Sequence, residues 1–62
     1  MDAVVRIKGK MTELLKDKPI MFSDLMDLFD KENYRDILLS WGELREEGLL
    51  KMDQEGLYYL EK

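Results

Sequence analysis

The stretch that decides the fold runs from Asn33 to Leu60 and reads NYRDILLSWGELREEGLLKMDQEGLYYL. Apolar residues recur at helical spacing over its first half, so the sequence predicts an amphipathic helix over Tyr34–Glu47. Gly48 follows at the position just past a helix end, where a left-handed backbone conformation favours glycine. Two short apolar segments, Leu49–Met52 and Leu57–Leu60, then predict the strands of a β-hairpin.

The loop of this hairpin is predicted at residues 53–56, Asp-Gln-Glu-Gly. A four-residue loop of this kind places its glycine, Gly56, at a position with positive φ. Side chains alternate along a strand, so if Tyr58 and Leu60 point inward, Tyr59 points outward.

The predicted helix has two faces when its residues are plotted at about 100° per residue. The apolar sector is expected to face the core and contains Tyr34, Ile37, Leu38, Trp41 and Leu44. The opposite face carries Arg35, Asp36, Leu39, Glu43 and Glu46, with Ser40 and Glu47 at its edge.

A first helix is predicted at the front of the chain, where one apolar stripe is formed by Val4, Ile7, Met11, Leu14 and Leu15. Pro19 ends it, because proline cannot continue a helix. Gly9 lies in its middle and costs about 1 kcal/mol relative to alanine. The alternative is therefore a short strand or arm over Ala3–Lys8, with the helix starting near Lys10.

A short second helix is predicted between these two. Residues 20–22, Ile-Met-Phe, form one edge strand, and Ser23 is expected to cap the helix N-terminus. Residues 30–33 predict a tight turn, and Asn33 with Asp36 resembles a capping box. The buried face of the second helix is expected to hold Leu25, Leu28 and Phe29, and the methionines at 11, 21, 26 and 52 are expected in the core or at its edge.

Composition excludes several classes of protein. Sixty-two residues form one domain with one small core. Without cysteine or histidine, zinc fingers, disulfide scaffolds and nearly all transition-metal sites are excluded, so no metal or cofactor is expected. The chain has no nucleophile–base pair, no phosphate-binding loop and no room for a large cleft, so we expect neither an enzyme nor a small-molecule substrate. No apolar run reaches membrane-spanning length and no signal peptide is evident, which predicts a cytoplasmic protein.

The order of helix, short strand, helix, turn, helix and hairpin covers residues 1–62 and resembles the winged helix-turn-helix superfamily. The motif Leu38-x-x-Trp41-x-x-Leu44-x-x-x-Gly48-Leu49-Leu50 is similar to that family's exit from its third helix, although Trp41 is bulkier than the usual aliphatic residue. Residues 20–25, IMFSDL, are similar to its entry into the second helix. The resemblance implies an α+β fold, with three helices, a small antiparallel sheet and a C-terminal β-hairpin wing.

The resemblance also implies a nucleic-acid-binding, transcription-regulator-like function, in which the third helix enters the major groove and the wing contacts the backbone. The candidate contacts are Lys31, Asn33, Arg35, Ser40 and Lys51, with Lys62 as a further cation. Asn33 and Arg35 are the residues suited to base edges. The alternative is that Asn33 only caps the helix and Arg35 is a solvated charge. Nearby carboxylates predict weak binding by a monomer, roughly 10⁻⁴ to 10⁻⁶ M, which a dimer would strengthen.

The competing hypothesis is a protein-interaction or dimerisation module that does not bind DNA through its acidic third helix. Leu39 is a large aliphatic residue on a charged face, and acidic neighbours such as Glu43 would favour a basic partner. Tyr59 on the wing is a second candidate contact. The cations of the first helix, Arg6, Lys8, Lys10 and Lys16, are a third surface, suited to nucleic acid, to an acidic face of a second copy, or to solvent alone.

Overall fold

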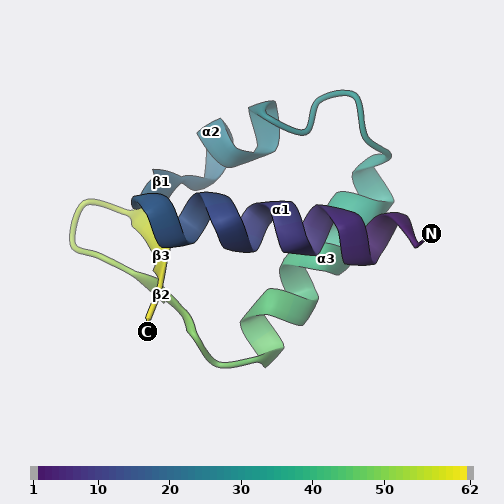
Figure 1. Cartoon of the computed structure of the whole chain (residues 1–62). Helices are drawn as coiled ribbons and strands as arrows, with labels where there is room; N and C mark the ends of the chain where they lie inside the picture. Colours follow the sequence, from purple (N-terminus) through teal and green to yellow (C-terminus); the bar gives the residue numbers. More distant parts are fainter. Residues whose placement is uncertain (1, 62) are drawn as a thin grey trace.

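The computed structural model describes residues 2–61 and contains three helices and a three-stranded antiparallel sheet (Figure 1). Lys62 lies outside the described residues. The elements follow in the order α1 (Ala3–Asp17), β1 (Ile20–Met21), α2 (Phe22–Asp27), α3 (Tyr34–Glu46), β2 (Leu50–Met52) and β3 (Leu57–Leu60). The predicted α+β class, with three helices and a C-terminal hairpin, is confirmed.

Helix α1 is continuous through Gly9, so the alternative of a separate strand or arm at its start is wrong. The Asp2 carboxylate accepts a hydrogen bond of 2.9 Å from the Val4 amide, which satisfies one of the unpaired donors of the first turn. At the other end the Lys18 amide donates to the Leu14 carbonyl before Pro19 ends the helix. Local capping at both ends offsets the cost of the central glycine.

The start of α2 differs from the prediction at Ser23. The residue before the helix is Met21, which makes no side-chain cap, and Phe22 is already helical instead of ending the strand. The Phe22 ring packs edge-on against Trp41 with ring centroids 5.0 Å apart. This contact joins residues that are far apart in the sequence. It favours Phe22 in the first turn of α2, and capping residues near Phe22 do not predict it.

Leu28 was expected in the core and instead is 60% exposed. Helix α2 has only six residues, so Leu28 lies just past its end, in a series of tight turns. Leu25 and Phe29 remain buried, as predicted. The shortness of α2 is the physical reason for the error.

The sheet has the strand order β1-β3-β2, with Ile20 opposite Tyr58 and Leu50 opposite Leu60. Strand β2 begins at Leu50, one residue later than predicted. Alternation along β1 buries Ile20 and exposes Met21. Met52 is exposed as well, so the prediction of core positions is wrong for these two methionines.

Both predicted positive-φ glycines are confirmed, with φ of 79° at Gly48 and 84° at Gly56. In the hairpin loop, the Asp53 carboxylate accepts hydrogen bonds of 2.9 Å from the amides of Glu55 and Leu57. The loop therefore combines a side-chain acceptor that closes the turn with a residue that adopts positive φ without a Cβ clash.

The core lies where α1, α2, α3 and the sheet meet. Trp41 links three of these elements, because its ring also packs edge-on against Tyr58 of β3 with centroids 4.9 Å apart. Val4 and Leu14, expected in the core, are only partly buried. The buried apolar residues are Ile7, Met11, Leu15, Ile20, Leu25, Phe29, Ile37, Trp41, Leu44 and Leu60.

Candidate interaction surface

The buried face of α3 is rotated relative to the predicted one. Tyr34 and Leu38 were expected in the core, but they are 67% and 42% exposed. The buried residues of the helix are Ile37, Ser40, Trp41 and Leu44. The core sector therefore turns toward Ser40 and leaves Tyr34 and Leu38 on the surface.

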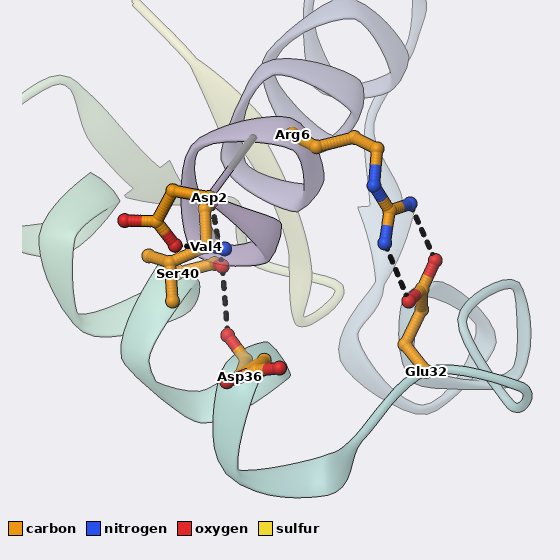
Figure 2. Close-up of polar contacts among 6 residues, drawn as sticks. All are labelled: Asp2, Val4, Arg6, Glu32, Asp36 and Ser40. Atoms are coloured by element: carbon orange, nitrogen blue, oxygen red, sulfur yellow. Dashed lines mark hydrogen bonds and ion pairs between the residues drawn. The ribbon is translucent and has the colours of Figure 1, made fainter.

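Ser40 explains this rotation. Its side chain is fully buried where α1 crosses α3, and its Oγ lies 3.0 Å from the Val4 carbonyl of α1 and 2.7 Å from the Asp36 carbonyl (Figure 2). A small side chain at this point lets the two helices approach closely, and the hydroxyl, which has one proton, donates to either of these two carbonyls. The prediction that Ser40 contacts nucleic acid is wrong, because it is inaccessible.

The carboxylates at the end of α3 are divided between two surfaces. Glu43 and Glu47 face α1, whereas Glu46 is on the outward face. Lys8 of α1 lies 3.7 Å from Glu43 and 2.5 Å from Glu47, and hydrogen bonding to Glu47 raises the pKa of the Lys8 ammonium. Glu43, expected at the rim of a protein interface, therefore belongs to the flank of α3 that faces α1. Glu47, the residue that follows α3, also faces α1, so neither carboxylate is at the centre of the outward face.

A second ion pair joins α1 to the turn before α3. The Arg6 guanidinium binds the Glu32 carboxylate through two hydrogen bonds of 2.6 and 2.8 Å (Figure 2). These hydrogen bonds lower the pKa of Glu32 and raise the pKa of Arg6. Two of the four cations of the first helix are thus paired within the chain, while Lys10 and Lys16 are exposed.

The Arg6–Glu32 pair predicts a pH dependence of stability. Because the folded pKa of Glu32 lies below its ordinary value of 4.5, the pair stabilises the fold above that value and is lost as the pH falls through the folded pKa. Glu32→Gln is expected to lower Tm slightly at pH 7 and to have a smaller effect at pH 3. Thermal melts of the unmodified chain and the variant at both pH values measure this. Glu13→Gln serves as the control, and an equal shift at both pH values would contradict the pairing.

Four other residues were predicted to contact nucleic acid. Two of them interact within the chain, and two are exposed without an ion pair. The Asn33 Oδ1 accepts a hydrogen bond of 2.9 Å from the Arg35 amide, so Asn33 caps α3, although its bond goes to Arg35 and not to Asp36. Lys51 on the wing lies 3.8 Å from the Glu61 carboxylate. Among residues 2–61, Lys31 and Arg35 are exposed and make no ion pair.

The outward face of α3 differs more from its prediction than any other surface of the chain. Its centre is a stripe of four residues, Arg35, Leu39, Gly42 and Glu46, which fall within about 60° of one another on a helical wheel. Leu39 is 48% exposed. A surface hollow of about 380 Å³ on the same helix is lined by Gly42, Arg45 and Glu46. Tyr34, Leu38 and Arg45 lie along one flank of this stripe. Helix α3 therefore exposes three large apolar side chains, Tyr34, Leu38 and Leu39, where the sequence had indicated only Leu39.

Two other surfaces carry apolar residues. Tyr59 on the wing is partly buried and lies opposite Lys51 in the sheet register. At the C-terminal end of α1 there is an open groove of about 550 Å³ between α1, β1, α2 and β3. Its lining is Leu14, Asp17, Lys18, Pro19, Ile20, Met21, Asp24, Leu28 and Leu57.

No protein-family model, curated protein or solved structure matches this chain. The resemblance to winged-helix proteins therefore rests on the chain's own motifs and order of elements. Across residues 2–61, none of the helices has both the length and the apolar character needed to traverse a bilayer.

Proposed function

We propose that this chain is a protein-interaction module whose contact surface is the outward face of α3. The observation that supports this most is the exposure of three large apolar side chains of α3, with Leu39 in the central stripe and Leu38 and Tyr34 on its flank. Single exposed apolar residues are ordinary, but a group of them beside charged residues is typical of interaction sites. Tyrosine and arginine are enriched at protein interfaces, and here both occur beside the two exposed leucines.

The charge of the molecule also favours a protein partner over nucleic acid. The net charge is −4, which opposes association with a polyanion. Of the five residues considered for nucleic-acid contact, Ser40 is buried, Asn33 caps a helix and Lys51 lies beside a carboxylate. Two contacts, Lys31 and Arg35, would remain, and affinity for phosphates increases with the number of contacts.

Binding of nucleic acid by a winged-helix regulator is the second candidate function. It is favoured by the position of Glu43 and Glu47, which pair with Lys8 and leave Arg35 and Arg45 on the outward face. A titration with duplex DNA at about 50 mM salt tests it, because electrostatic association is strongest at low salt. The protein-interaction proposal expects no detectable binding there; binding that weakens steeply with added salt would favour the DNA function instead.

Leu39→Asp tests the proposed contact surface. The unmodified chain, immobilised on a resin, is incubated with a cell lysate and with a labelled soluble copy of itself. We expect Leu39→Asp to weaken retention of the bound protein by about tenfold or more, because a charge replaces an apolar anchor. Circular dichroism should show an unchanged fold, since Leu39 is a surface residue.

Leu28→Asp is the matched control, since Leu28 is also an exposed leucine but lies in the groove at the end of α1. It should retain the partner as the unmodified chain does. If Leu28→Asp abolished retention and Leu39→Asp did not, the contact surface would be that groove and not α3.

A further inference from the structure

We propose that the partner of the outward face of α3 is a second copy of this chain, with the two α3 helices packed antiparallel about a two-fold axis. In this dimer Arg35 lies opposite the partner's Glu46, and Leu39 packs over the partner's Gly42. The inference rests on the proposed function and names its partner. It follows from three properties of the four-residue stripe.

The first property is spacing. The stripe Arg35, Leu39, Gly42, Glu46 has intervals of four, three and four residues. This pattern is the same in both directions along the helix, so a reversed copy places its four residues opposite the same four positions. A two-fold interface needs such self-complementarity, because the same patch serves on both subunits.

The second property is charge. Arg35 and Glu46 end the stripe, and neither makes an ion pair within residues 2–61. They are eleven residues apart, about 16 Å along the helix axis, and so cannot reach each other in one chain. Antiparallel packing places each Arg35 opposite the partner's Glu46, so the pair occurs twice in the dimer, whereas parallel packing would place like charges together. The opposed helix dipoles favour the antiparallel arrangement as well.

The third property is shape. Leu39 projects from the helix, whereas Gly42, three residues further along the stripe, has no side chain. A Cβ built at Gly42 would meet nothing within 4 Å, so no packing inside the chain requires a glycine there. The hollow that Gly42 lines with Arg45 and Glu46 gives the partner's Leu39 a place to pack. Glycine in a helix interior costs about 1 kcal/mol relative to alanine, and close approach of a second helix accounts for that cost.

The flank of the stripe widens the contact. Leu38 and Arg45 lie on the same side of α3, and antiparallel packing sets Leu38 beside the aliphatic stem of the partner's Arg45. A seam of one helix is smaller than the roughly 1,200–2,000 Å² of a stable standard interface, so the dimer should be weak and concentration-dependent.

A charge-exchange experiment tests this geometry. Arg35→Glu and Glu46→Arg are prepared as separate chains, and their average mass is measured by sedimentation equilibrium alone and as an equimolar mixture. Each variant alone opposes like charges at two positions and is expected to dimerise about tenfold more weakly than the unmodified chain. In the mixture both positions pair opposite charges, so dimerisation should return to within about threefold of the unmodified chain.

A mixture that associates no better than the separate variants would overturn the antiparallel pairing. So would single variants that dimerise as well as the unmodified chain. The unmodified chain could stay monomeric and capture a different protein from the lysate, which the Leu39→Asp variant does not retain. In that case the second-copy inference fails and the proposed contact surface stands. If the chain is monomeric and Leu39→Asp changes no capture, both fail.

Discussion

Trp41→Ala is expected to leave the chain largely unfolded at 25 °C. Trp41 is 8% exposed and its ring packs against Phe22 of α2 and Tyr58 of β3. Truncating a buried tryptophan to alanine costs about 3–5 kcal/mol. A domain of this size with one core and no disulfide rarely has more than about 3–5 kcal/mol of total stability. The loss is therefore comparable with the whole free energy of unfolding.

Urea unfolding followed by far-UV circular dichroism measures this loss. Trp41→Phe keeps a ring at the site and should retain a cooperative transition at lower urea concentration. Tyr34→Ala is the matched control, because it truncates an exposed aromatic residue on the same helix and should change stability by less than about 0.5 kcal/mol. A Trp41→Ala chain within about 1 kcal/mol of the unmodified chain would show that this aromatic cluster does not hold α2, α3 and the sheet together.

Ser40→Leu is expected to have the second largest effect. The Ser40 side chain is fully buried, and its hydroxyl lies 3.0 Å from a backbone carbonyl of α1. A leucine there has no space, so α1 must move away from α3 at a cost of about 1–3 kcal/mol. The displacement should also separate Lys8 from Glu43 and Glu47.

Ser40→Ala separates volume from hydrogen bonding. It removes the hydroxyl without adding bulk and should cost only about 0.5–1.5 kcal/mol, the usual net contribution of one hydrogen bond. The order of stability is therefore expected to be serine, alanine, leucine, measured by the same urea transitions. A leucine variant more stable than the alanine variant would mean that α1 does not cross α3 at this residue.

The ends of α1 and α3 and the hairpin turn could be predicted because each has a local chemical cause. Pro19 follows α1, Asn33 caps α3, and Gly48 and Gly56 adopt positive φ at the helix exit and in the hairpin loop. These signals act over a few residues and are visible in sequence. Ser23 failed as a cap because a contact between Phe22 and Trp41, nineteen positions apart, draws Phe22 into the helix.

The rotation of α3 could not be predicted, because it depends on where another helix crosses it. Tyr34 and Leu38 lie close to Trp41 on a helical wheel, so hydropathy alone assigned all three to the core. The small Ser40 admits α1, and this turns the other side of α3 outward. The same crossing brings Glu43 toward Lys8. The sequence predicted that Leu39 is an exposed contact. It did not predict that Tyr34, Leu38 and Gly42 belong to the same surface region, and the structure shows this.

The proposed dimer joins two copies of the chain through the outward face of α3. Its most direct test is the average mass of the unmodified chain, measured by sedimentation equilibrium from about 10 µM to 1 mM at low salt, the range for a weak interface. The mass should rise from the 7.4 kDa of one chain toward twice that value as concentration increases. A mass of 7.4 kDa at every concentration would contradict the claim.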